Sequence, residues 1–108
     1  MRLCIIAGCV SEPDARQMPG LVTIRVDDLT AGLAEIRAER CDCIVTPETI
    51  GEASSVSCLD VARVARGYRV GCVIVTDAPC GGPHGAVCMV PGGDLATSLK
   101  RAMVARRR

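Results

Sequence analysis

The sequence predicts an α/β fold: a three-layer sandwich with a five-stranded parallel sheet covered by helices on both faces. Two observations carry this prediction. Strand-like and helix-like segments alternate along the chain, and the strands in the middle of the set are apolar almost throughout, as strands buried on both faces are. Right-handed crossovers make 2-1-3-4-5 the simplest strand order, and a functional site is then expected at the carboxyl ends of the strands.

Length and composition limit the function classes. At 108 residues the chain has the size of one ordinary domain, so we expect residues 1–108 to form a single domain. The chain has no Trp, no Phe and one Tyr, so its core must be aliphatic, with cysteines among the fillers. The formal charge is +1, which provides no broad field for nucleic acid or an anionic membrane. We therefore expect neither as a partner.

The N-terminal third predicts a strand, a short helix and a second strand. Leu3–Ala7 is a continuous apolar run closed by Gly8, too short for a signal peptide or a membrane span. We therefore expect a cytoplasmic protein. Ser11–Met18 has room for two helical turns, and Leu21–Val26 alternates apolar and polar residues as an edge strand does.

The second helix has the clearest pattern. Asp27 or Asp28 is a suitable N-cap, and Leu29, Leu33 and Ile36 recur at helical spacing on one face. Charged residues fill the opposite face. The pattern predicts an amphipathic helix that packs against the sheet.

The middle of the chain predicts two buried strands around a third helix. Cys41–Thr46 is a strand ended by Pro47, and Glu48–Ser57 is a loop or helix entry. The third helix then ends at Gly67, a plausible C-cap, and Arg69–Thr76 is an apolar fourth strand.

The C-terminal third predicts a loop, a last strand and a last helix. Ala78–Gly85 contains two prolines and three glycines, which favour a loop, and Ala86–Val90 is a fifth strand. Asp94 is the expected cap of the last helix. The tail Arg106–Arg108 is interpreted as a solvated helix end whose cations complement the terminal carbonyls.

Several segments, taken in order, resemble the receiver domain of two-component response regulators, a family with a flavodoxin-like fold. Ala31–Val45 is similar to that family's second helix and third strand. Leu59–Arg66 and Val73–Ala78 resemble its third helix and fourth strand, and Val90-Pro91 with the last helix resembles its closing segment. The resemblance extends over nearly the whole chain and implies a role in signal transduction.

The residues that receivers need for phosphorylation are largely replaced. Family members hold magnesium with a carboxylate pair after the first strand and place a lysine after the fifth, because an aspartate attacks a phosphoryl group only when its charge is neutralised. In this chain the magnesium positions fall at Ala7 and Gly8, and the lysine position falls at Met89 or Val90. The resemblance therefore implies a degenerate receiver, or pseudo-receiver.

The phosphoacceptor region keeps one family feature. The acceptor position falls at Thr46, Pro47 or Glu48, none of which is an aspartate, whereas Thr76 fits the family's hydroxyl residue and Asp77 follows it. Glu48 imitates a phosphorylated aspartate only if it points into the pocket, and a plain surface glutamate is the simpler interpretation. We predict no catalytic residue and no cofactor. A kinase, an output domain or a second copy of the chain is the expected partner.

One segment departs from the family's architecture. Receivers carry a full helix between the fourth and fifth strands, and that helix belongs to a main partner surface. In this chain residues 78–85 connect the two strands. They are too few to form that helix, and their prolines and glycines break helices. The sequence therefore predicts that this helix is missing or reduced, which leaves binding through the usual surface in doubt.

Eight cysteines accompany these features. In a reducing compartment they act as small hydrophobic residues, and the sequence predicts five packing residues, Cys4, Cys43, Cys58, Cys72 and Cys88. An alternative function is that of a thiol- or metal-dependent protein, for redox chemistry or metal binding. It would use Cys9, Cys80 and His84, which follow the first and fourth strands and are expected at one edge of the sheet. Their spacing is not that of a zinc site, and Cys41-x-Cys43 has no second pair nearby.

Two further alternatives remain open. Cys9 also resembles the nucleophile of cysteine phosphocarrier domains, but Glu12 and Asp14 follow it and would repel an anion. A receiver pocket could also be rebuilt from four aspartates. Asp77 is expected near the edge of the sheet that carries such a pocket, whereas Asp27 and Asp28 follow the outer strand and are expected too far from it. These four are Asp27, Asp28, Asp42 and Asp77.

Overall fold

The computed structural model describes residues 1–6, 20–48, 57–77 and 83–106. Its centre is one five-stranded sheet in the order β2-β1-β3-β4-β5, and every neighbouring pair is parallel. The predicted topology is therefore confirmed. The strands are β1 (Arg2–Ile6), β2 (Val22–Val26), β3 (Cys43–Pro47), β4 (Gly71–Val75) and β5 (Val87–Met89).

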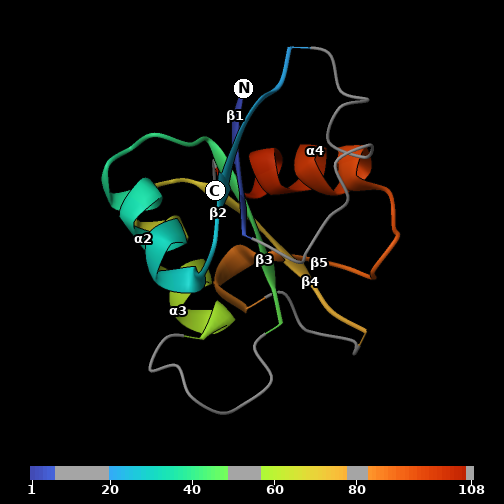
Figure 1. Ribbon diagram of the computed structural model, residues 1–108. Helices are drawn as coiled ribbons and strands as arrows, with labels where there is room; N and C mark the ends of the chain where they lie inside the picture. The colour runs from blue at the N-terminus through green and yellow to red at the C-terminus, as the bar shows by residue number, and fades with distance from the viewer. Residues whose placement is uncertain (7–19, 49–56, 78–82, 107–108) are drawn as a thin grey trace.

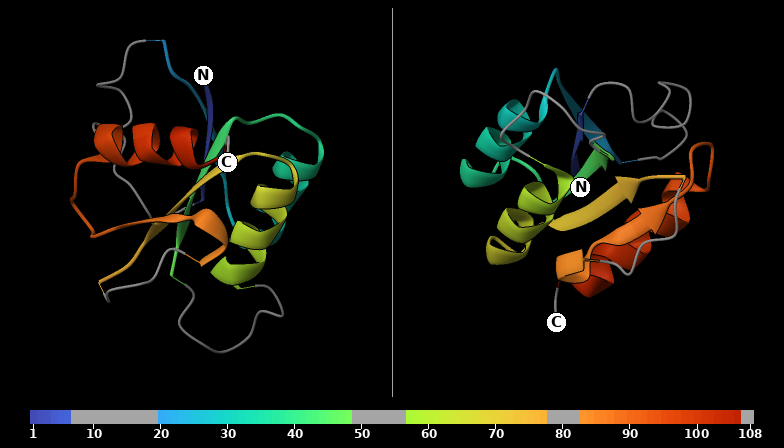
Figure 2. Two further views of the ribbon diagram at one scale, coloured as in Figure 1. Left: turned by 180° about the vertical axis from the view of Figure 1, so that it is seen from behind. Right: turned by 90° about the horizontal axis from the view of Figure 1, so that it is seen from below.

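Helices cover both faces of this sheet, as predicted. The helices α2 (Leu29–Arg37) and α3 (Cys58–Gly67) lie side by side on one face, and α4 (Leu95–Ala105) lies on the other (Figures 1 and 2). The helix predicted for Ser11–Met18 lies outside the described residues. The structure is therefore a three-layer α/β sandwich.

The sheet separates two apolar cores. Successive side chains of a strand point to opposite faces, so Ile44 packs in the core beneath α2 and α3, and Val45 packs in the core beneath α4. Both side chains are fully buried. All residues of β4 are buried, whereas β2 has only exposed and half-buried residues because it forms the edge of the sheet.

Polar side chains cap the start of each helix. Asp28 Oδ1 accepts a hydrogen bond from the Ala31 amide at 2.8 Å, and the Asp94 side chain accepts from the Thr97 amide. Both aspartates were predicted caps. Ser57 and Asp60 form a reciprocal capping box at the start of α3, and Ser57 is the last residue of the segment that the sequence predicts as loop or helix entry. Hydrogen bonds from Ser57, first from its backbone N–H, lower the pKa of Asp60.

Two helices end in a turn that ordinarily favours glycine. After α3, the Arg69 amide donates to the Arg66 carbonyl and the Val70 amide donates to the Ala65 carbonyl, the pattern of a Schellman motif. The left-handed residue of this motif is Arg69, with φ 57°, and Glu39 has the same place after α2, with φ 56°. Such a conformation costs a non-glycine residue about 1–2 kcal/mol.

Gly67, which the sequence predicted as the C-cap of α3, does not have that role. It is the last helical residue, and Tyr68 is the cap because its amide still donates to the Val64 carbonyl. The left-handed turn therefore comes two residues later than the glycine. Arg69 bears the conformational cost that a glycine would avoid.

No α-helix separates β4 from β5 in the described part of the chain, which confirms the predicted departure from receiver architecture. That part contains only η1 (Pro83–Gly85), a single turn of 3-10 helix. Among the described residues we find no membrane-spanning candidate, because none of their helices combines the necessary length and apolar character.

Candidate functional site at the carboxyl edge of the sheet

The predicted phosphoacceptor region assembles at the carboxyl edge, which is the lower edge in Figure 1. Because β3 and β4 are parallel neighbours, Pro47 pairs with Val75 and the chain leaves both strands at the same place. Glu48 therefore follows β3 beside Thr76, which follows β4. The predicted magnesium positions, Ala7 and Gly8, lie outside the described residues.

A hydrogen bond joins the two strand ends. The Thr76 hydroxyl donates to Glu48 Oε2 at 2.5 Å, within the range of bonds from a hydroxyl to a carboxylate. The backbone holds both residues in place, since the Glu48 amide donates to the Val75 carbonyl at 3.0 Å and the Thr76 amide donates to the Met89 carbonyl at 2.9 Å. Thr76 is only 5% exposed, whereas Glu48 is exposed. Glu48 therefore has its carboxylate directed at the neighbouring strand end.

The other residues at the predicted acceptor position cannot accept a phosphoryl group as they lie. Thr46 is fully buried, and its hydroxyl donates to the Pro47 carbonyl at 3.1 Å. Pro47 has no nucleophilic side chain. Asp77 is exposed after β4. Within the predicted region, Thr76 and Glu48 are joined side chain to side chain.

The end of β5 is apolar. Met89 is buried in the core beneath α4, and Val90, at 60% exposure, faces outward. No cationic side chain is present at either position. The carboxylate of Glu48 therefore receives no charge neutralisation from the fifth strand.

The aspartates do not rebuild a metal pocket. Asp42 precedes β3 and lies at the opposite, amino edge, where its Oδ2 accepts from the Arg2 amide at 2.7 Å. That hydrogen bond, helped by the guanidiniums of Arg2 and Arg106, lowers the pKa of Asp42. Asp28 is occupied as the cap of α2. Within the described ranges, no group of three His, Cys, Asp or Glu side chains could hold a metal ion.

His84 is not at the edge predicted for it. It lies in η1, directly before β5, and lines a hollow with Gly71, the first residue of β4. The chain must return from the carboxyl end of β4 to the amino end of β5, because the two strands are parallel, and His84 comes at the end of that return. Cys9 and Cys80, its proposed partners, lie outside the described residues.

The sequence did not lead us to expect a group of cationic residues around His84, and it led us to interpret Arg106 only as part of a solvated helix end. Arg66, Arg69 and Arg106 line the same hollow. All three lie at or just after the end of a helix, and in a parallel α/β fold helix ends meet at the amino edge. That shared position was the signal available in the sequence.

Three cysteines are packing residues, as predicted. Cys4, Cys43 and Cys72 are buried and form no disulfide. Cys58 is half-buried against the core that contains Cys4 and Cys72. Burial raises the pKa of Cys43 to about 12 and also raises that of Cys72. Cys41 differs, because a hydrogen bond with Cys4 lowers its pKa.

Cys88 corrects the prediction for the fifth packing cysteine. It is disulfide-bonded. Its partner is none of the five cysteines that form no disulfide, Cys4, Cys41, Cys43, Cys58 and Cys72. Cys88 lies on β5 next to Ile74 of β4, whose side chain packs in the core beneath α2 and α3. The sequence could not reveal this bond, because strand spacing does not determine cysteine pairing.

The chain matches no model of a known protein family, and neither the curated proteins nor the solved structures compared with it gave a match. What the structure shows is the strand order 2-1-3-4-5 of a flavodoxin-like parallel α/β fold.

Proposed function

We propose that this protein is a degenerate receiver-like signalling domain, acting in the cytoplasm through protein contacts and without aspartyl phosphorylation. The observation that carries the proposal is the hydrogen bond from Thr76 to Glu48. In a receiver domain the corresponding hydroxyl residue serves the phosphoacceptor site. Here it holds a permanent carboxylate at the same edge of the sheet.

The chemistry of the neighbouring residues supports a non-enzymatic role. Attack of a carboxylate on a phosphoryl group needs a divalent cation and a lysine to neutralise the charge of the transferring group. The sequence has Ala7 and Gly8 where the metal carboxylates are expected, and Met89 and Val90 where the lysine is expected. A phosphoryl group at this edge would add charge beside Glu48 without a compensating cation.

Glu48 also suggests how such a domain signals. Its carboxylate is exposed while its Thr76 partner is buried, so the bond fixes a negative charge where a kinase, an output domain or a second copy of the chain can meet it. The missing helix between β4 and β5 removes the surface that receivers usually present. The carboxyl edge around Glu48 is therefore the proposed contact site.

Incubation of the full chain with acetyl phosphate and Mg²⁺ is expected to give no mass increase in intact-protein mass spectrometry, because neither the metal carboxylates nor the lysine is present. A receiver domain with intact acidic residues serves as the positive control in the same reaction. A phosphoryl group mapped to Thr46 or Glu48 would contradict the proposal.

The disulfide at Cys88 favours a second candidate function, a thiol-dependent protein. Of the seven other cysteines, five form no disulfide, and Cys9 and Cys80 lie outside the described residues. Both were singled out by the sequence for a thiol site. A reversible bond between two of these three sulfurs is the chemistry that this alternative requires.

Alkylation of the air-oxidised, denatured protein is expected to modify six thiols, since the disulfide withholds two of the eight cysteines. Reduction before alkylation is expected to release all eight. Alkylation of the folded protein at neutral pH is expected to spare Cys43 and Cys72, whose burial raises their pKa. Eight modified thiols without reductant would rule out the second function.

A further inference from the structure

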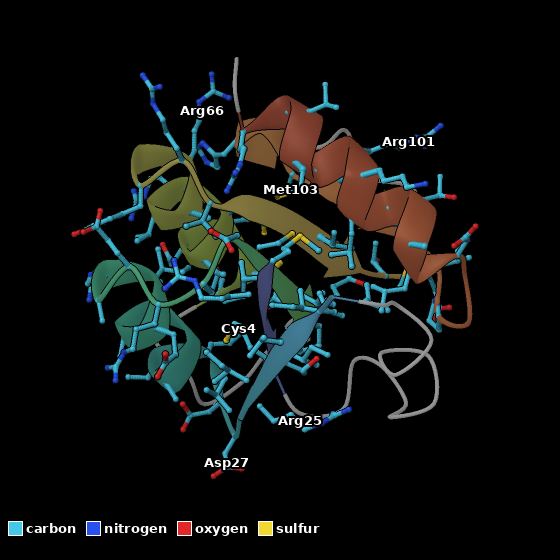
Figure 3. The ribbon with its side chains drawn as sticks, turned by 90° about the horizontal axis from the view of Figure 1, so that it is seen from above. Cys4, Arg25, Asp27, Arg66, Arg101 and Met103 are labelled. Carbon is cyan, nitrogen blue, oxygen red and sulfur yellow. The ribbon has the colours of Figure 1, made fainter. Side chains whose placement is uncertain are left out.

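A hollow of about 100 Å³ opens at the amino edge of the sheet, opposite the edge that carries Glu48 and Thr76. It lies where α3 ends, β4 begins and α4 ends. Small residues, among them Gly71 and Ala102, form part of its lining. Figure 3 views the molecule from this edge and labels Arg66 on the side where α3 and α4 come together.

Four cationic or basic side chains line this hollow. Arg66 and Arg69 come from the end of α3 and the turn after it, His84 comes from η1, and Arg106 caps the end of α4. Three separate parts of the chain therefore direct residues of one chemical type to one place. No carboxylate is among the described residues that line it.

The charges of the hollow are only partly balanced. Arg106 Nη1 lies 3.9 Å from Asp42 Oδ1, beside the hollow, but Asp42 is shared with Arg2 at 3.6 Å. In the described structure neither Arg66 nor Arg69 forms an ion pair, in contrast to Arg2 and Arg106. The C-termini of α3 and α4 add about half a negative charge each. Three guanidiniums exceed these negative charges, so the hollow remains electropositive.

Backbone conformation gives an independent indication of function. Among the described non-glycine residues, Glu39, Arg69 and His84 have positive φ, and two of these three line the hollow. Arg69 has φ 57° and His84 has φ 53°, although glycine adopts such angles without strain. Strained residues of this kind concentrate at functional sites. At Arg69 the left-handed angle belongs to the Schellman motif after α3, and at His84 it belongs to η1.

Gly85 completes the site. A Cβ atom at this position would lie 3.1 Å from Arg66 Nη1. The glycine therefore leaves space for the Arg66 guanidinium to reach across to the turn that carries His84.

We propose that this hollow binds a phosphate group through Arg66, Arg69, His84 and Arg106. Guanidinium groups match the oxygens of phosphate in paired hydrogen bonds, and several of them together favour a dianion over a single carboxylate. Ligand pockets for drug-sized molecules measure roughly 300–1,000 Å³. The hollow therefore suits one phosphate group, free or at the end of a small phosphate monoester. It is separate from the proposed signalling edge, so either proposal can fail without the other.

Titration of the full chain with inorganic phosphate, by isothermal calorimetry at constant ionic strength, tests the site. We expect saturable binding that weakens about tenfold or more in Arg66→Gln and in Arg69→Gly, because each change removes charge-assisted hydrogen bonds to the anion. Arg37→Gln is the matched control for charge: it removes one exposed arginine from the end of α2 and is expected to change affinity less than twofold.

Arg69→Gly also separates binding from folding. The substitution relieves the left-handed strain, so we expect the melting temperature to rise by about 4–8 °C while phosphate affinity falls. Glu39→Gly is the matched control, because Glu39 has the same motif position and nearly the same φ. It is expected to raise the melting temperature similarly and to leave affinity unchanged.

Three results decide the proposal. Absence of saturable phosphate binding would overturn it, and so would an equal loss of affinity in Arg37→Gln and Arg66→Gln, which indicates nonspecific charge. Selective loss in Arg66→Gln and Arg69→Gly supports it. Glycerol phosphate, titrated in parallel, then identifies the source: equal or tighter binding indicates a phosphate monoester, and much weaker binding indicates free phosphate.

Discussion

Replacement of Ile44 by alanine is expected to lower the free energy of unfolding by about 3–4 kcal/mol. Ile44 is the second residue of β3, the central strand, and is fully buried beneath α2 and α3. The surrounding backbone cannot collapse into the resulting cavity, because β3 is paired with β1 on one side and with β4 on the other. Urea denaturation followed by far-UV circular dichroism measures the loss.

Val22→Ala is the control for this prediction. Val22 lies on the edge strand β2 with 60% of its surface exposed, so its truncation is expected to cost less than about 1 kcal/mol. Similar losses for the two variants would mean that β3 is not buried by helices on both faces.

Gly71→Val is expected to destabilise the fold by about 2–3 kcal/mol, through overpacking in place of a cavity. A Cβ atom at Gly71 would lie 3.0 Å from the Ala102 carbonyl oxygen and 3.1 Å from Cys43 Sγ. The first contact is with the backbone of α4, which cannot rotate away as a side chain can. The helix must therefore shift from β4, and a lower urea midpoint reports the cost.

Gly67→Ala is the matched control, since the position is also a glycine close to the amino edge. It is the last residue of α3, and an added Cβ atom meets nothing within 4 Å. Alanine is expected to stabilise the helix by about 0.5–1 kcal/mol. A Gly71→Val protein as stable as the wild type would contradict the close packing of α4 on β4.

Much of the fold could be predicted because its signals are local. Continuous apolar runs identify strands that are buried on both faces, and Asp28 and Asp94 identify the starts of two helices. The end of α3 could not be predicted from Gly67, because the left-handed turn was displaced to Arg69. Tertiary packing determines where a helix ends, and a glycine at the left-handed position only lowers the conformational free-energy cost of the turn.

The two candidate sites were less predictable than the fold, because they depend on the paths of the segments that connect strands and helices. Glu48 and Thr76 each follow a strand directly, so strand order alone places them together. His84 is separated from β4 by a return across the sheet, and its edge was assigned wrongly. The Cys88 disulfide and the arginines of the hollow depend on contacts between distant segments, which no local pattern records.

The orientation of the helices has a consequence for how the molecule behaves at a distance. Each described α-helix starts at the carboxyl edge, with Asp28, Asp60 or Asp94 in its first turn or cap, and ends toward the edge that carries Arg66, Arg69 and Arg106. These side-chain charges oppose the helix dipoles, whose positive ends lie at the carboxyl edge, so the molecule keeps only the difference between the two contributions as its dipole moment. Its field turns an approaching charged molecule before contact, over about 8 Å at physiological salt, and this preorientation disappears as ionic strength rises.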